Sequence, residues 1–231
     1  AGDTILTSSL DGTVRQWDVS TGSEQRRIIN QDEPLRWLNV SPDGRYLAVI
    51  AGLDTIQIWD IAAGDMLRQL QGHEGQIATA VFSPDGQYLA SASHDRTIAL
   101  WDVATGEEIR RFEGHVARVL GAVFSPDGQQ LVSGGQDATI RLWDVATGEL
   151  IDRFVTSGPV NDVAFSSDGS FIASAGPQDR VVRLWDVATG EEIEQLRGST
   201  SGVGLVEISP DDRYVVSGGL GNVPHLWEVE V

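Results

Sequence analysis

The sequence predicts an all-β fold in which short antiparallel sheets stack face to face. Two observations in its 231 residues predict this fold: a repeat of 42 residues along nearly the whole chain, and short apolar runs separated by turn residues. The repeat is marked by one tryptophan per unit, at Trp17, Trp59, Trp101, Trp143, Trp185 and Trp227. Because the same spacing continues from end to end, we treat residues 1–231 as one repeat domain.

Each unit is expected to form four short strands. In the third unit they are predicted at Ile77–Phe82, Tyr88–Ser91, Thr97–Val103 and Glu108–Phe112. The turns between strands contain Ser-Pro-Asp-Gly and Ala-Thr-Gly-Glu, whose Pro, Asp and Gly residues favour tight turns. No segment of useful length shows the period of an amphipathic helix.

Many of these strands are apolar on both faces. In the strand that contains Trp101, Ile98 and Leu100 lie on one face and the large tryptophan lies on the other. A single sheet with one solvated face would alternate apolar and polar residues instead. We therefore expect the sheets to stack radially, so that neighbours cover both faces and only short edges stay exposed.

The two ends of the chain predict incomplete sheets. The chain is half a repeat shorter than six full repeats. By the register of the repeats, it begins after the position of an innermost strand, and it ends after the strand that contains Trp227. The first sheet should therefore lack its innermost strand, and the last its outermost strand. Pro224 stands where the other repeats have Val or Ile, and its missing N–H suits an edge strand. Either the ring is imperfectly closed, or upstream residues are not in this chain.

Composition excludes several classes of function. The chain carries 34 Asp and Glu against 16 basic residues, all of them arginine, and its net charge is -18. Such a surface repels phosphate backbones and anionic lipid, so we expect no nucleic acid and no membrane partner. The absence of cysteine removes disulfides, thiolate catalysis and cysteine-based zinc sites. No apolar run could span a bilayer and no signal peptide is visible, which favours a cytoplasmic location for a chain that does not begin with Met.

The repeats resemble the WD-repeat family of β-propellers. The resemblance is carried by Gly-His pairs, turn aspartates and Trp-Asp pairs, for example Gly72-His73, Gly114-His115, Asp11, Asp95, Asp137 and Asp179. It implies a single β-propeller of six Trp-bearing blades, each a four-stranded antiparallel sheet, with the first and last blades incomplete. Phrases such as Trp-Asp-Val-Ala-Thr-Gly-Glu resemble bacterial members, in which propellers are often fused to signalling or effector domains.

The resemblance also implies a hydrogen-bonded tetrad of His, Ser or Thr, Asp and Trp in each blade. Two blades hold the full set, namely His73, Ser91, Asp95 and Trp101, and His115, Ser133, Asp137 and Trp143. Other blades keep part of it, at Thr7, Asp11, Asp179 and Ser217. They depart from it at Gln31, Val49, Leu53, Ser157, Ser199 and Gly221. We therefore expect less rigidity toward the two ends of the chain.

Catalytic and metal-binding motifs are not evident. No nucleophile elbow, phosphate-binding loop or metal-ligand spacing occurs, and the histidines outside the tetrads, His94 and His225, have no local ligand partner. We expect no catalytic residue, no metal and no cofactor. A propeller enzyme that uses channel residues would have few polar groups to draw on, mainly Arg36, Asn39, Asp162 and Glu207.

One predicted rim of the propeller varies in chemistry from repeat to repeat. The loops into the innermost strands and the residues before the turn aspartates differ, whereas the turns of the opposite face stay nearly constant. We take the variable rim as the candidate partner-binding site, with Arg36, Trp37, Glu74, Gln76, His94, Arg118, Gln136, Asn161 and Gln178. Neutral drift of exposed loops would give a similar pattern, and Trp37, a typical interface residue, could equally pack in the core.

These observations favour a non-catalytic platform or scaffold that recognises a protein or peptide, the sensor part of a larger bacterial protein. The alternative is a structural or assembly subunit whose incomplete end blades are completed by another chain or an upstream segment. The identity of the partner and the oligomeric state are left open by the sequence.

Overall fold

A computed structural model describes residues 2–178, 180–198, 202–219 and 223–229. All the regular elements in these ranges are β-strands, and they form six antiparallel sheets. Within the same ranges, no helical segment reaches the length and hydrophobicity that a bilayer crossing requires. The predicted roles of Asp179, Ser199 and Gly221 lie outside the described residues.

The first three sheets cover the N-terminal half of the chain. The first contains β1 (Thr4–Ser8), β2 (Thr13–Asp18) and β3 (Glu24–Asn30). The second contains β4 (Leu35–Val40), β5 (Tyr46–Ala51), β6 (Thr55–Asp60) and β7 (Asp65–Leu70). The third contains β8 (Ile77–Phe82), β9 (Tyr88–Ser93), β10 (Thr97–Asp102) and β11 (Glu108–Glu113).

The last three sheets repeat this order. The fourth contains β12 (Val119–Phe124), β13 (Gln130–Gly135), β14 (Thr139–Asp144) and β15 (Leu150–Val155). The fifth contains β16 (Asp162–Phe165), β17 (Phe171–Ala175), β18 (Val181–Asp186) and β19 (Glu192–Arg197). The sixth contains β20 (Val203–Ile208), β21 (Tyr214–Gly219) and β22 (His225–Glu228).

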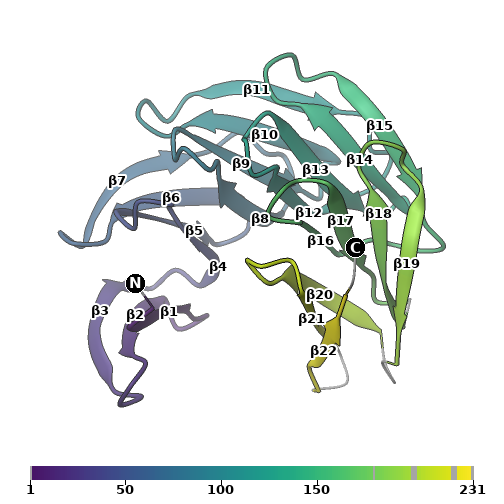
Figure 1. Ribbon diagram of the computed structural model, residues 1–231. Coiled ribbons are helices and arrows are strands. Elements are labelled where there is room, and N and C mark those ends of the chain that lie inside the picture. Colours follow the sequence, from purple (N-terminus) through teal and green to yellow (C-terminus); the bar gives the residue numbers. More distant parts are fainter. Residues whose placement is uncertain (1, 179, 199–201, 220–222, 230–231) are drawn as a thin grey trace.

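The sheets follow one another around an arc, with β4, β8, β12, β16 and β20 toward its centre (Figure 1). Each four-stranded sheet is a meander, so neighbouring strands in the chain are also neighbours in the sheet. The two end sheets have three strands each, and no described strand of the first pairs with the last. The fold expected from the repeat, including the incomplete end blades, is therefore confirmed, and the described residues form an open arc.

The core lies between the sheets rather than within any one of them. Five clusters of buried apolar side chains occupy the five junctions between consecutive sheets. At two of these junctions, Trp101 and Trp143 pack against the preceding sheet and are 2% and 1% exposed. Trp17 has no described sheet before it and is only half-buried. Stacking therefore explains why strands in the middle of the chain are apolar on both faces.

Candidate functional site

A chain of hydrogen bonds links four side chains in the fourth sheet. The indole N–H of Trp143 donates to Ser133 Oγ at 2.9 Å, and Ser133 Oγ lies 2.8 Å from His115 Nε2. On the other side of the ring, His115 Nδ1 lies 3.0 Å from both carboxylate oxygens of Asp137. The structure thus brings together all four residues of this tetrad.

The four side chains of this tetrad allow one consistent assignment of hydrogen-bond donors and acceptors. The Trp143 indole can only donate, so Ser133 Oγ accepts from it, and in a neutral ring that donates from Nδ1 the Ser133 hydroxyl donates to His115 Nε2. Nε2 is then an acceptor, and the proton of the neutral ring sits on Nδ1 and is donated to Asp137. Burial lowers the pKa of His115 despite the neighbouring carboxylate, which agrees with a neutral imidazole.

Asp137 remains ionised for a different reason. Burial acts to raise the pKa of its carboxyl, but hydrogen bonds from Thr139 and the Val116 N–H, together with His115, hold it below its ordinary value. The bond from Val116, at 3.0 Å, fixes the loop that leads into the innermost strand. In the third sheet, Asp95 fixes the Glu74 N–H in the same way at 3.1 Å. Each tetrad is therefore an anchor for a loop of the candidate rim.

The third sheet repeats the arrangement with closely similar distances. Trp101 Nε1 donates to Ser91 Oγ at 2.8 Å, His73 Nε2 lies 2.8 Å from the same oxygen, and His73 Nδ1 donates to Asp95 at 2.7 Å. In the second sheet, where Val49 and Leu53 replace the polar members, the Trp59 indole donates to Gln57 at 3.0 Å. Sequence reasoning missed this role of Gln57. The sequence did contain a sign of it, since Gln57 is the only amide at this position of the six repeats.

The candidate rim rests on a backbone frame that recurs in three sheets. The N–H before the turn aspartate, or before Leu53 in the second sheet, donates to a carbonyl oxygen of the loop into the innermost strand. These bonds join Gly52 to Pro34 at 3.0 Å, His94 to Gln76 at 2.8 Å and Gln136 to Arg118 at 2.8 Å. Because the frame is constant, the side chains on it are free to differ in chemistry.

The rim side chains differ in how far they reach solvent. Arg36, Glu74, Arg118, Gln136 and Gln178 are exposed, whereas Trp37, Gln76, His94 and Asn161 are half-buried. Among the described residues, no hydrogen bond or ion pair holds the Arg118 guanidinium. Partial burial and the charge of Arg118 lower the pKa of His94, which places these two residues close together at the junction of the third and fourth sheets.

Trp37 does not stand free on this rim. Its ring packs against the core cluster between the second and third sheets, and its indole nitrogen is buried without a hydrogen-bond partner among the described residues. The innermost strand directs the Trp37 side chain into the sheet junction. Trp37 is therefore better described as a core residue than as an exposed anchor for a partner.

Two polar residues near the centre of the arc act as ties between sheets. Asn39 Oδ1 accepts from the Phe82 N–H at 2.9 Å, and Asp162 Oδ2 accepts from the Val206 N–H at 3.0 Å. Burial raises the pKa of Asp162 to about 7, with a further contribution from the charge of Glu207. In the described ranges, no three His, Cys, Asp or Glu side chains gather into a group that could hold a metal ion.

A family model matches most of this architecture. The WD40 model, described as WD domain, G-beta repeat, matches residues 1–18, 64–102, 106–144, 148–186 and 190–228. The chain belongs to the WD-repeat family. The matched segments include both full tetrads but leave out residues 19–63, in which Gln31, Val49 and Leu53 occupy tetrad positions.

Curated WD-repeat relatives match over a shorter stretch. Fifty residues are 40% identical to Coronin-7 of Rattus norvegicus, and 50 residues are 42% identical to Coronin-7 of Bos taurus. These stretches cover 22% of this chain but only 5% and 6% of the two relatives. The likeness therefore concerns the repeat itself.

Proposed function

We propose that this WD-repeat chain is a non-catalytic platform that binds a protein or peptide at the rim defined above. The observation that carries the proposal is the constant backbone frame on which Gln76 with His94, and Arg118 with Gln136, present different side chains. Membership of the family supports an interaction scaffold in general terms. The repeated segments that resemble bacterial members, such as Trp-Asp-Val-Ala-Thr-Gly-Glu, favour a role as the sensor part of a larger protein.

The proposed mechanism is recognition by a rigid surface. The tetrads hold the loops before strands β8 and β12, so these loops lose little conformational freedom when a partner binds. The exposed Arg118 guanidinium offers a cation to a carboxylate of the partner. Because the chain has a net charge of -18, such a cation on the rim should contribute strongly to specificity.

Site-specific photo-cross-linking tests this proposal. A photoreactive amino acid is placed at Gln136 on the rim or at Glu107 in a turn of the opposite face, and the chain is expressed within its own full-length protein. We expect covalent capture of one protein from position 136 and not from position 107. Capture of the same protein from position 107 alone would contradict the rim as the binding surface.

The alternative function, an assembly subunit, is favoured by the exposed faces of the two end sheets. Leu226 and Val216 of the last sheet are 68% and 42% exposed, whereas Leu184 and Ala173, at the corresponding places of the fifth sheet, are fully buried. Ile5 in the first sheet is 54% exposed. Exposed apolar surface of this kind typically meets another sheet.

Light scattering distinguishes this alternative from the platform. If the end faces mediate assembly, the protein should form concentration-dependent oligomers, and Leu226→Asp should abolish them. Leu53→Asp is the matched control, because Leu53 is 52% exposed but lies on the rim. A protein that stays monomeric at all concentrations would contradict the assembly function.

A further inference from the structure

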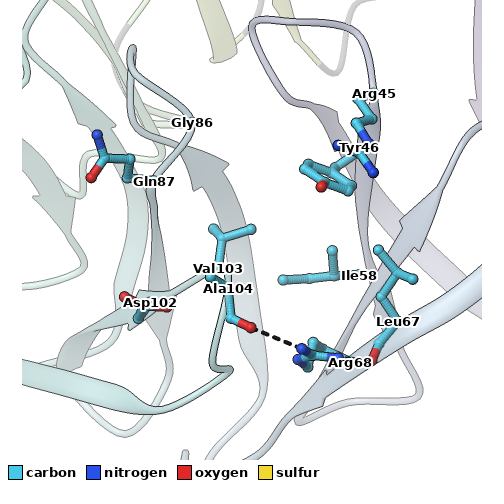
Figure 2. A pocket seen from close by; sticks show the side chains of 10 residues that line it. All are labelled: Arg45, Tyr46, Ile58, Leu67, Arg68, Gly86, Gln87, Asp102, Val103 and Ala104. Atoms are coloured by element: carbon cyan, nitrogen blue, oxygen red, sulfur yellow. Dashed lines mark hydrogen bonds between the residues drawn. The ribbon is translucent and has the colours of Figure 1, made fainter.

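Two equivalent pockets lie on the face opposite the rim. The first, of about 460 Å³, opens between the second and third sheets, and the second, of about 430 Å³, between the third and fourth. Figure 2 shows the first pocket: Tyr46, Ile58 and Leu67 line one side, and the Gly86 turn and Val103 line the other. The residues that line the second pocket are largely those one repeat further along the chain.

A tyrosine and an arginine occur together at both pockets, whereas the same places at the first junction hold Thr4 and Arg26. Tyr46 with Arg68 lines the first pocket, and Tyr88 with Arg110 lines the second. At the next junction the same places in the repeat hold Gln130 and Asp152. The tyrosine and arginine are therefore not required by the blade structure, which forms at both kinds of junction.

The two pockets are neighbours across a single turn. Gly86 lines the first pocket, whereas Tyr88, at the end of the same turn, lines the second. A smaller hollow of about 280 Å³ beside Pro84 and Tyr88 extends the second pocket along the turn. One extended ligand could therefore occupy both pockets by crossing the turn.

The pocket walls offer apolar surface and hydrogen-bond donors together. Leu67 and Ile109 are 39% and 46% exposed at the two pockets. Arg68 donates to the carbonyl oxygen of Ala104 at 2.8 Å, as Figure 2 shows. Among the described residues, the buried Nε of Arg110 has no acceptor. An apolar side chain of a peptide would cover the exposed surface of Leu67 or Ile109, beside guanidinium groups that already donate to the facing turns.

The charge around the pockets indicates the flanks of the ligand. Four aspartates line the two pockets and the smaller hollow beside them: Asp85, Asp102, Asp127 and Asp144. Hydrogen bonds from the N–H groups of Thr105 and Thr147 hold the pKa of Asp102 and Asp144 below the ordinary value, so both are ionised at neutral pH. Three of the described arginines line the pockets as well, but Arg45 pairs with Asp60 at 3.5 Å, and the other two donate to backbone carbonyl oxygens of the facing turns. The aspartates at the border are complementary to lysine or arginine residues of a ligand.

We propose that the two pockets form one bipartite site for an extended basic peptide that places one apolar side chain in each pocket. Side chains two or four residues apart point to the same face of an extended strand, which rises about 3.3 Å per residue. Packed sheets lie about 10 Å apart, so two residues, which span about 7 Å, are too short, and four residues, which span about 13 Å, are the shortest same-face spacing that reaches both pockets. The ligand class is thus a peptide with two aliphatic or aromatic anchors at this spacing and basic flanks.

Fluorescence anisotropy with designed peptides tests this site. The probe is a labelled peptide of about 12 residues, with two leucines four positions apart and two lysines at each end. We expect it to bind at least about tenfold more tightly than the peptide in which one leucine is replaced by serine. Replacement of the lysines by glutamates should abolish binding. A two-leucine peptide that binds no tighter than the one-leucine peptide, or that fails to bind at about 1 mM, would overturn the proposal.

Variants of the protein locate the peptide. Leu67→Ser and Ile109→Ser should each weaken binding of the two-leucine peptide by about tenfold or more. Ile151→Ser is the matched control, since Ile151 has the same place in the repeat and is 48% exposed, but lies beside Gln130 and Asp152. An equal loss with Ile151→Ser would overturn the site. A loss of peptide binding with the rim variant Arg118→Glu, but not with Leu67→Ser, would also overturn the site.

Discussion

The carboxylate of Asp162 accepts a hydrogen bond from the Val206 N–H at 3.0 Å and so ties β16 to β20 of the next sheet. Asn39, two positions further along its own innermost strand, makes a similar bond to the Phe82 N–H at 2.9 Å between β4 and β8. A tie between neighbouring innermost strands is thus made once by a neutral amide and once by a titratable acid whose pKa burial raises to about 7. We therefore expect the junction of the fifth and sixth sheets to be sensitive to pH.

We expect Asp162→Asn to stabilise the protein, and to do so more at pH 8 than at pH 5. The pKa of Asp162 is raised in the folded state, so its protonated form contributes stability that is fully present below the unfolded value of about 4 and is lost as the pH rises through 7. Because the unfolded carboxyl is already ionised at pH 5, the difference between pH 5 and pH 8 is at most about 3 kcal/mol. Melting temperatures of both proteins at pH 5 and pH 8 measure it.

The reciprocal substitution serves as the control. Asn39→Asp should introduce the same pH dependence at the junction of the second and third sheets, and should lower the melting temperature more at pH 8 than at pH 5. Parallel pH profiles for wild type and Asp162→Asn would contradict the role assigned to Asp162.

Asp137→Ala should destabilise the fold by about 1–3 kcal/mol, because it leaves the buried His115 and the Val116 N–H without their acceptor. The control is Asp54→Ala: Asp54 is exposed, and the Thr55 hydroxyl lies 3.3 Å from it. In a protein of this size, each kcal/mol lowers the melting temperature by about 2–4 °C. Equal shifts for the two variants would show that the tetrad does not support the blade.

The strand pattern could be predicted because its signals are local. The Gly86 turn and the 42-residue register place β8 to β10 within two residues of their predicted bounds. The missing strands of the end sheets followed from the same register. Each of these features depends on residues within one repeat, which the sequence displays directly.

Features formed between repeats could not be predicted. The tie from Asp162 to Val206 and the pockets beside Tyr46 and Tyr88 depend on how one sheet faces the next, and so does the packing of Trp37, for which the sequence left the rim and the core equally open. Sequence comparison between repeats identified positions that vary, but it could not tell which varying positions of two blades meet. The opposite face, whose turns are nearly constant, therefore gave no sign of its pockets.

Gly176→Ala should destabilise the fifth blade. A Cβ atom added at Gly176 would lie 2.0 Å from the carbonyl oxygen of Pro159, and only a shift of the backbone would relieve that contact. We expect a loss of about 1–3 kcal/mol in urea unfolding. Gly218→Ala is the control, since an added Cβ there meets no atom within 4 Å, and it should be neutral or slightly stabilising. A loss of the same size at both positions would contradict the close approach at Gly176.

The rim proposal leads to a charge-reversal prediction. Arg118 is exposed, and no described residue pairs with its guanidinium, so Arg118→Glu should leave the melting temperature unchanged within about 1 °C. Glu107, exposed in a turn of the opposite face, provides the matched control through Glu107→Lys. Both substitutions reverse one charge, and they differ in the face that they change.

Once cross-linking has identified a partner, Arg118→Glu should weaken its binding by at least about tenfold, because a carboxylate would then face the acidic group that the guanidinium met. Glu107→Lys should leave the affinity within about twofold, since a solvated charge on the far face is screened beyond about 8 Å at physiological salt. Calorimetric titrations at low and high salt measure both effects. If affinity responds to Glu107→Lys and not to Arg118→Glu, the partner binds the opposite face and the rim is not the recognition surface.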